Sequence, residues 1–330
     1  MTVSQMPETK KKISLVHIII VNYNGWSDTI ECLDSLIKVV YRNINITIVD
    51  NNSTDDSLSQ ISSWIKNKGF QVNLIDTEEP ADTRSGEGVI AMIKNKENRG
   101  YGAGINTGIK YALLCNPDYI LALNNDTVVD PGFLHPLVEL CEKDNEIGIA
   151  SGKIYYHDRP KVIWSNGGKF YPCRGKLAHL NFNETDIGVE APEKINFING
   201  CMWLIPGHVL RKTGLINEEY FMYVEDLEYC SRVIRSGFTL RICGRSFIYH
   251  KVGRSSGSGK FNNFSVFLRT RNLGRFFLKS ELNVLCKISA FFIYNLKLGI
   301  QLLLRRDFSL IPVQISAIVN SLKKENKSLW

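Results

Sequence analysis

Apolar and polar positions follow a repeating strand–helix pattern along the first third of the chain. Ile13–Val21 and Ile44–Asp50 are short apolar runs rich in β-branched residues, which is typical of buried strands. Between them, Trp26–Val39 predicts a helix. One face of that helix carries the apolar residues Ile30, Leu33, Leu36 and Ile37. Together the three segments predict a βαβ unit.

The same alternation continues to about residue 125. It predicts a helix over Asp55–Lys68, a strand over Phe70–Ile75, a helix over about Ala103–Leu114 and a strand over Tyr119–Leu123. The segment Thr77–Glu97 is polar and rich in Gly, Glu and Lys, so we expect a surface loop there. Alternating strands and helices predict an α/β fold with a mostly parallel sheet flanked by helices.

After Pro131 the pattern becomes mixed. It predicts a helix to about Glu142, short strands through Phe170, a helix over Asp226–Ser236 and a strand over Thr239–Tyr249. From about Phe261 the chain is helical in pattern. We therefore divide the chain into a polar tail (1–12), an α/β domain (13–255) and a helical extension (256–330).

The helical extension is basic and contains a long apolar segment. Lys251–Arg306 holds eleven basic residues and one acid, Glu281. Val284–Leu304 is long enough to span a bilayer, but polar residues interrupt it, which favours an amphipathic helix at a membrane interface. Its lipid-facing residues would be Phe291, Phe292, Leu296, Ile300 and Leu303, with Lys and Arg toward anionic headgroups. A helix packed on the α/β domain is the alternative.

Composition narrows the class of protein. With 44% hydrophobic residues the chain can bury a full core, and its net charge of +7 suits an anionic partner such as a nucleotide diphosphate, a phospholipid surface or nucleic acid. The eight cysteines are scattered without a C-x-x-C pair, which favours a reduced, cytosolic compartment. The first apolar run is too short for a secretion signal, so we expect none.

Polar clusters follow the first two predicted strands. Val21-Asn22-Tyr23-Asn24 ends the first strand and Asp50–Asp55 ends the second, at the sheet edge where ligands bind. Asp50 can accept hydrogen bonds from a nucleotide, although a turn that caps the next helix explains it equally well. NAD binding is disfavoured, because the first turn lacks the G-x-G-x-x-G pattern.

Two further segments carry acidic residues. Asn124-Asn125-Asp126 ends a strand, where Asp126 with a neighbouring amide oxygen can hold a divalent cation together with substrate phosphates. Glu225-Asp226 begins a helix behind an aromatic run, where a partly dry cleft suits a general base. The simpler alternatives are a strand end and a helix cap that complements the helix dipole.

Taken together and in order, these segments resemble inverting glycosyltransferase family 2, which has the GT-A fold. The resemblance covers roughly residues 13–250 and lies in Val21–Asn24, Val49–Asp55, Asn98–Asn106, Asn124–Asp126, Asn199-Gly200 and Glu225-Asp226. It implies a Rossmann-like, mostly parallel sheet, a nucleotide-sugar donor and a Mg²⁺ or Mn²⁺ cofactor.

The resemblance also implies a role for each matched position. The nucleotide-binding positions would be Val21, Asn22, Tyr23, Asp50, Arg99, Asn124 and Asn125. Asp226 would be the catalytic base with Glu225 beside it, and Asp126 and His250 would bind the metal. The sugar or acceptor pocket would include Asn199, Gly200 and Trp203, although Trp203 is equally plausible as core. The sequence departs from the family at Asn124, which replaces the first acid of the D-x-D motif and leaves one carboxylate for the metal.

The run Phe267–Phe276 looks like that of bacterial rhamnosyltransferases. This implies transfer of rhamnose from dTDP-rhamnose to a lipid-linked oligosaccharide during surface polysaccharide (O-antigen) synthesis, by a cytoplasmic protein peripheral to the inner face of the cell membrane. UDP-hexose and UDP-galactofuranose donors stay open, as does a homo-oligomer. A non-catalytic, membrane-bound binding protein with the same fold is the rival hypothesis, and we expect no nucleic-acid partner despite the basic, phenylalanine-rich extension.

Overall fold

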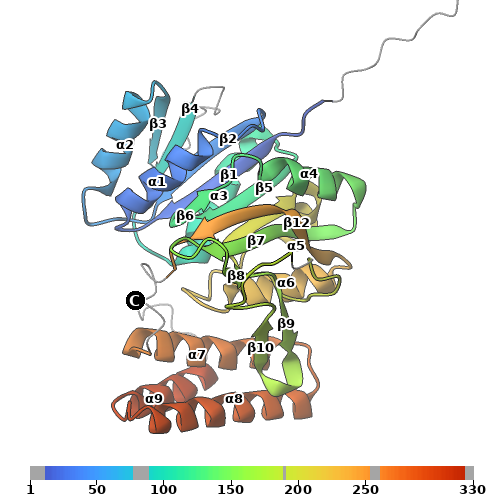
Figure 1. The fold of residues 1–330 in the computed structure, drawn as a ribbon. Coiled ribbons are helices and arrows are strands. Elements are labelled where there is room, and N and C mark those ends of the chain that lie inside the picture. The colour runs from blue at the N-terminus through green and yellow to red at the C-terminus, as the bar shows by residue number, and fades with distance from the viewer. Residues whose placement is uncertain (1–11, 77–88, 189–190, 253–260, 324–330) are drawn as a thin grey trace, which may run out of the picture.

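A computed structural model describes residues 12–76, 89–188, 191–252 and 261–323 (Figure 1). The first half contains β1 (Val16–Asn22), α1 (Trp26–Leu36), β2 (Ile44–Asp50), α2 (Ser57–Asn67), β3 (Gln71–Asp76), β4 (Val89–Lys94), α3 (Tyr101–Ala112), a 3₁₀ turn η1 (Leu113–Cys115) and β5 (Tyr119–Asn124). β1 pairs in parallel with β2 and β5. The predicted βαβ unit is therefore confirmed.

The predicted loop over Thr77–Glu97 is wrong in its second part, because that part contains β4. This strand lies between β2 and β3 and is parallel to both. Its residues Ile90, Ala91, Met92 and Ile93 are buried. A parallel strand covered on both faces has a continuous apolar run in place of alternation, and the charged residues around it hid that run. Residues 77–88 of the predicted loop lie outside the described residues.

The second half adds strands to the same sheet. Its elements are β6 (Thr127–Val129), α4 (Leu134–Lys143), β7 (Ile147–Tyr156), β8 (Ile163–Ser165), β9 (Gly168–Tyr171), η2 (Pro172–Arg174), β10 (Lys176–His179), β11 (Met202–Pro206), α5 (Gly207–Thr213), α6 (Glu225–Arg235) and β12 (Thr239–His250). Across the described ranges, the ten-stranded sheet has the order β3-β4-β2-β1-β5-β11-β7-β12-β6, with β8 beside β7. β9 and β10 form a separate hairpin.

Each face of the sheet has its own core. Side chains of α1, α2 and α4 pack with one set of strand residues, among them Leu33, Ile61 and Leu137. Side chains of α3, α5 and α6 pack on the opposite face, among them Ile105 and Val233. The strands stay in register between these layers, so polar residues that follow several strands meet at one end of the sheet.

The helical extension forms a layer beneath the sheet (Figure 1) and consists, where described, of α7 (Asn263–Lys279), α8 (Val284–Leu304) and α9 (Leu310–Leu322). Phe276 and Phe277 of α7 and Ala290 of α8 belong to the same core as α3 and α6. The Phe277 ring stacks on Phe170 of the hairpin, with centroids 6.4 Å apart. The predicted boundary between residues 255 and 256 lies outside the described residues.

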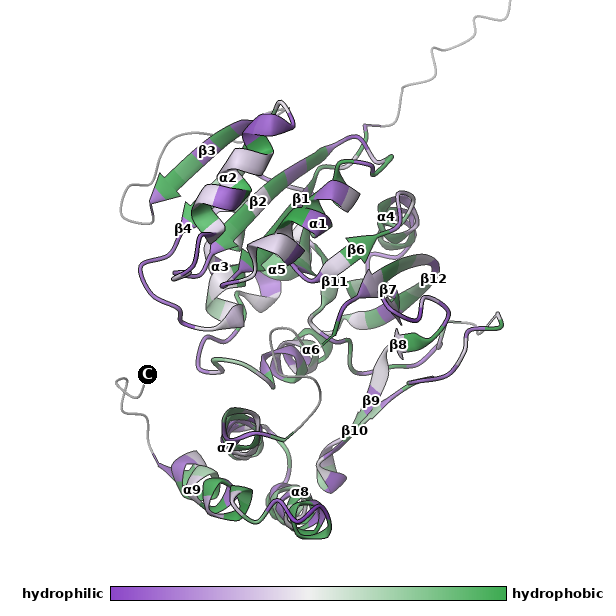
Figure 2. Cartoon of the chain, turned by 60° about the vertical axis from the view of Figure 1, so that its left-hand side comes forward, coloured by the Kyte–Doolittle hydropathy of each residue, from purple (hydrophilic) through white to green (hydrophobic). Residues whose placement is uncertain are grey.

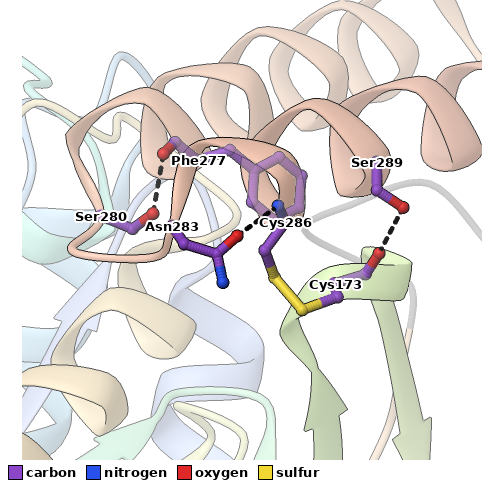
Figure 3. The surroundings of a disulfide bond; sticks show 6 residues. All are labelled: Cys173, Phe277, Ser280, Asn283, Cys286 and Ser289. Carbon is purple, nitrogen blue, oxygen red and sulfur yellow. Dashed lines mark hydrogen bonds between the residues drawn. A yellow bond between two sulfur atoms is a disulfide. The ribbon is translucent and has the colours of Figure 1, made fainter.

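A disulfide joins the hairpin to the extension. Cys173 in η2 is bonded to Cys286 in the first turn of α8, 113 residues later in the chain (Figure 3). The expectation that the cysteines are all reduced is therefore wrong for this pair. The sequence offered no signal for it, because only the tertiary fold brings the two residues together.

The α8 helix leaves much of its apolar surface uncovered. Among the described residues, it is the one helix long and apolar enough to cross a membrane. The residues Phe292, Leu296, Ile300 and Leu303 are exposed, as predicted. Phe291 is not, because it points to the opposite side of the helix and packs against the core shared with α7. Figure 2 shows the apolar stretches along α8 and α9.

Candidate active site

The ends of β1 and β2 form a closed hydrogen-bond network around Asp50. Asn22 Nδ2 donates to Asp50 Oδ1 at 2.9 Å, and the backbone N–H and hydroxyl of Ser53 donate to the same carboxylate. Asp50 and Asn22 have no exposed surface and Val21 has almost none, whereas half of Tyr23 is exposed. The bonds from Ser53 to Asp50 form a turn after β2, which is the structural alternative to nucleotide binding considered for Asp50 in the sequence. A ligand at this edge would meet Tyr23 before any of the three buried side chains.

A chain of asparagines connects the end of β2 to the start of α3. Asn95 Nδ2 donates to Asn51 Oδ1, and Asn51 Nδ2 donates to Asn98 Oδ1, each at 2.9 Å. The exposed Arg99 pairs with Glu218 at 3.0 Å and lines a cavity of about 540 Å³. The network fixes the segment that carries Arg99, and sequence reasoning did not find it.

The fold brings together Asp126 and His250, which are 124 residues apart in the sequence. β12 runs antiparallel to β6 with His250 opposite Thr127, and His250 Nε2 lies 3.1 Å from Asp126 Oδ1. Both residues are buried, and the Trp164 ring packs edge-on against the imidazole. Burial acts to raise the pKa of Asp126, but the hydrogen bond and charge of His250 outweigh it and hold that pKa below its usual value.

The donor set at Asp126 and His250 suits a divalent cation. A carboxylate oxygen and an imidazole nitrogen that face each other can bind one ion from two sides. Within the described part of the chain, no group of three or more His, Cys, Asp or Glu residues is arranged so that it could hold a metal ion. The other ligands would therefore be substrate phosphates and water, which is how Mg²⁺ is commonly held.

The two asparagines before Asp126 have different surroundings. Asn125 Nδ2 donates to Thr29 Oγ1 at 3.1 Å and to the Gly25 carbonyl at 3.4 Å, which ties the end of β5 to the first turn of α1. Asn124 is half-buried at the end of β5, and its backbone N–H donates to the Cys201 carbonyl at 2.9 Å. Asn125 therefore supports the site structurally.

Glu225 and Asp226 begin α6 in a very different environment. Glu225 is buried, and its Oε2 has no hydrogen-bond partner among the described residues. Asp226 is partly exposed, and its Oδ1 accepts from the Leu227 N–H at 2.8 Å. Burial raises the pKa of both carboxyls, and the charge of Asp226 raises the pKa of Glu225 further. Such a pair takes up protons more readily than ordinary carboxylates do.

The segment Asn199-Gly200-Cys201 connects the two acidic sites. A Cβ on Gly200 would lie 3.6 Å from the Asp226 Cβ, and the Tyr101 hydroxyl donates to the Gly200 carbonyl at 2.9 Å. Burial raises the pKa of Tyr101 well above its usual value, and Cys201, Glu225, Asp226 and Asp126 raise it further. The Tyr101 hydroxyl therefore interacts electrostatically with the carboxylates of both acidic sites.

Tyr101 was not among the predicted site residues, although it lies inside the matched segment Asn98–Asn106. Trp203, which the sequence assigned either to the pocket or to the core, has no exposed surface. Its ring stacks on Tyr229, and its Nε1–H donates to the Ile198 carbonyl at 3.2 Å. Trp203 therefore belongs to the core beneath the site.

Residues 17–214 match the family described as Glycosyl transferase family 2. The chain belongs to this family. The matched residues include the strand-end network, Arg99, Asp126 and the segment Asn199–Cys201. Glu225, Asp226, His250 and the helical extension lie beyond them, so their part in this glycosyltransferase depends on the geometry described above.

Curated relatives of this glycosyltransferase are themselves sugar transferases. A hexosyltransferase of low-salt glycan biosynthesis from Haloferax volcanii is 26% identical over 233 residues, 68% of this chain and 64% of that protein. The dTDP-rhamnosyl transferase RfbF of Shigella flexneri is 23% identical over 222 residues, 65% of this chain and 71% of that protein. The chain spans about 60–64% of the length of the first relatives.

Solved structures confirm the GT-A fold. GalNAc-T7 with UDP, GalNAc and Mn²⁺ superposes with a TM-score of 0.60 at 16% identity, covering 80% of this chain and 48% of that one. The mannosyltransferase PcManGT from Pyrobaculum calidifontis, with GDP-Man and Mn²⁺, gives 0.58 at 15% identity, covering 96% and 89%. Both neighbours were solved with Mn²⁺, which agrees with use of a divalent metal by such enzymes.

Proposed function

We propose that this chain is an inverting glycosyltransferase in which Asp226 is the general base. The observation that carries the proposal is the contrast between the two neighbouring acidic sites. A partly exposed carboxyl with a raised pKa, Asp226, stands beside Gly200, whereas the contact with His250 holds the pKa of Asp126 below its usual value. A base with a pKa nearer neutrality transfers protons more effectively than an ordinary aspartate.

The reaction is a single displacement. The acceptor hydroxyl oxygen attacks the anomeric carbon and passes its proton to Asp226, while the bond from that carbon to the diphosphate breaks and the nucleoside diphosphate leaves with the electron pair. The sugar configuration is therefore inverted. A divalent cation, Mg²⁺ or Mn²⁺, would be held by Asp126 and His250, and when bound it would offset charge on the diphosphate.

For the donor we propose dTDP-rhamnose, with a lipid-linked oligosaccharide as the acceptor. The relative RfbF is named as a dTDP-rhamnosyl transferase, which supports this sugar. The exposed apolar surface of the helical extension supports a lipid-linked acceptor. UDP-hexose and UDP-galactofuranose are the alternative donors.

We further propose that α8 and α9 rest on the surface of an anionic membrane. Phe292 is 68% exposed and Leu285 is 80% exposed, and the apolar row continues to Leu304. The exposed Lys297, Arg305 and Arg306 lie on the same helix or just after it. Apolar burial together with attraction between basic residues and anionic lipid is the usual basis of such docking.

Flotation with phosphatidylglycerol vesicles tests the membrane docking. The double variant Phe292→Asp with Leu296→Asp should lose most vesicle binding, whereas Ile187→Asp should not, because Ile187 is exposed on the sheet domain. Equal binding by all three proteins would contradict this surface.

The transfer reaction is tested with a panel of nucleotide sugars and a synthetic lipid-diphosphate disaccharide, in the presence of Mn²⁺. We expect one donor to be consumed, with the new glycosidic bond inverted relative to the donor by proton NMR. Retained configuration would contradict the single displacement. Absence of both transfer and hydrolysis with every donor would favour the non-catalytic binding protein.

A further inference from the structure

The four residues before the proposed base pair, Phe221–Val224, which we term the catalytic loop, adopt a strained backbone. Tyr223 has φ 67° and Val224 has φ 79°, both in the left-handed region. A β-branched residue such as valine is a true outlier there, because its side chain crowds the backbone. Such strain persists only where the surroundings hold the chain in place.

The described contacts account for every carbonyl of the catalytic loop. The Phe221 carbonyl accepts from the Tyr101 N–H at 3.0 Å, and the Val224 carbonyl accepts from the Glu228 N–H at 2.8 Å within α6. The contact with α3 is close, because a Cβ on Gly100 would lie 2.0 Å from the Phe221 oxygen. The loop is thus fixed at its two ends by α3 and α6.

The middle of the catalytic loop is fixed by one side chain from the helical extension. Asn272 Nδ2 donates to the Met222 carbonyl at 2.9 Å and to the Tyr223 carbonyl at 3.1 Å. The buried Arg271 donates through Nε to Asn272 Oδ1 at 3.0 Å, which fixes the direction of the amide. Asn272 has no exposed surface, and these three bonds use both of its donor hydrogens and its oxygen.

A second contact joins the same helix to the loop. The Arg269 guanidinium lies 4.4 Å from the centre of the Tyr223 ring. Further along α7, Phe276 and Phe277 bind the helix into the core under α6. Because these residues of α7 are buried in the core, the core sets the position of Asn272, and Asn272 in turn holds the loop.

We propose that Asn272 is a positioning residue of the transfer reaction: through the carbonyls of Met222 and Tyr223 it holds the strained catalytic loop that presents Asp226 to the acceptor. The inference rests on the proposed function, and it gives the helical extension a part in catalysis that is separate from membrane docking. Only Val224 and Glu225 separate the second of these carbonyls from Asp226. Release of the two carbonyls would therefore let Asp226 move away from Gly200.

The test compares the full-length wild type with Asn272→Ala, Asn272→Asp and the control Asn295→Ala. Aspartate keeps the size of the side chain and the acceptor for Arg271 but cannot donate to the carbonyls. Asn295 is a partly buried asparagine of the same extension that bonds within α8 and to Gln314 of α9. The readouts are amide hydrogen exchange by mass spectrometry, kcat, and KM for the donor.

Both Asn272 variants should lower kcat about 100-fold with donor KM changed by less than about twofold, since small misplacements of catalytic groups have such effects. Amide exchange should speed up in residues 223–227 and stay unchanged in β1 and β5. Asn295→Ala should leave the loop exchange and kcat near those of the wild type.

Several outcomes would overturn the proposal. These are unchanged exchange in the loop, exchange that rises equally throughout the sheet, and a loss expressed mainly as higher donor KM. Exchange can be measured without turnover. A wild type that transfers no sugar would therefore refute the proposed function, while the exchange data would still decide whether Asn272 holds the loop.

Discussion

The two acidic sites, Asp126 just after β5 and Glu225-Asp226 at the start of α6, differ in what surrounds each carboxylate. Asp126 faces His250 at 3.1 Å, and its pKa is held down by that contact despite burial. Asp226 and Glu225 have no comparable partner in the described structure, and burial raises their pKa values. The first site is arranged to remain charged, whereas the second is arranged to accept a proton.

This difference arises from topology. The partner of Asp126 comes from β12, whose pairing with β6 places His250 at the end of β5. Glu225 and Asp226 instead begin a helix, where backbone N–H groups give partial compensation for negative charge. A carboxylate at a strand end beside a histidine thus stays ionised, whereas a carboxylate at the start of a helix in apolar surroundings takes up a proton more readily.

The largest effect should come from Asp226→Asn. The amide keeps the shape of the side chain but cannot take the acceptor proton, so kcat should fall about 10³-fold, within the usual range for loss of a general base. Donor affinity and melting temperature should stay near those of the wild type. If Asp226→Asn retained more than a tenth of the wild-type kcat, Asp226 would not be the general base, and the proposed difference in role between the two acidic sites would be wrong.

Asp126→Ala should have the next largest effect, about 100-fold on kcat/KM, with much weaker Mn²⁺ binding in the presence of donor. The reason is loss of the carboxylate that we assign to the cation. Mn²⁺ titration monitored by isothermal calorimetry and by turnover measures both quantities. If EDTA left wild-type activity intact, or if Asp126→Ala matched the wild type in Mn²⁺ affinity, the assignment would be wrong.

A gain is expected for Asn124→Asp. A second carboxylate near Asp126 adds negative charge to the cation site, so Mn²⁺ affinity should rise about tenfold. The same calorimetric titration measures this change, and Asn125→Asp is the matched control, because Asn125 instead bonds to Thr29 and Gly25. Equal gains in both variants would indicate a general charge effect on the site.

The smallest effect concerns stability. Burial and the charge of Asp226 raise the pKa of Glu225 in the folded state to about 8, above the ordinary value of about 4.3, so the native state binds more protons than the unfolded state between these two pH values. Its stabilising contribution is complete below about pH 4.3 and is lost as pH rises through the raised pKa. A difference of one in pKa between the folded and unfolded states corresponds to about 1.4 kcal/mol. In the wild type, the free energy of unfolding should therefore fall between about pH 5 and about pH 9, and Glu225→Gln should make this fall smaller. Urea titrations at a series of pH values measure it. An unchanged dependence of the free energy of unfolding on pH in Glu225→Gln would contradict the prediction.

Local pattern was sufficient to predict most of the first half of the fold. The apolar runs at Ile13–Val21 and Ile44–Asp50 became β1 and β2, because hydrophobic periodicity and strand length are set by nearby residues. The strand-end polar clusters and Glu225-Asp226 were also found in this way. β4 was missed since its flanking charges outweighed its apolar run, Val89–Ile93.

Features that depend on distant pairings were not predictable from one sequence. The Asp126–His250 contact came from family resemblance, because 124 residues separate the two. The sequence around Asn272 and around Met222 contains no pattern that predicts a contact between residues 50 positions apart. The position of Tyr101 between both acidic sites likewise requires the packing of α3 against Gly200.

The Cys173–Cys286 bond groups the residues of the chain differently from the division into sheet domain and helical extension. It closes a covalent ring that contains Gly200, Asp226, His250 and Asn272, whereas Asp50, Arg99 and Asp126 lie outside it. A single peptide cleavage anywhere inside the ring leaves the protein in one covalent piece until a reductant is added. While the bond is intact, a protease that nicks the chain near Asp226 therefore cannot by itself release α8 from the hairpin.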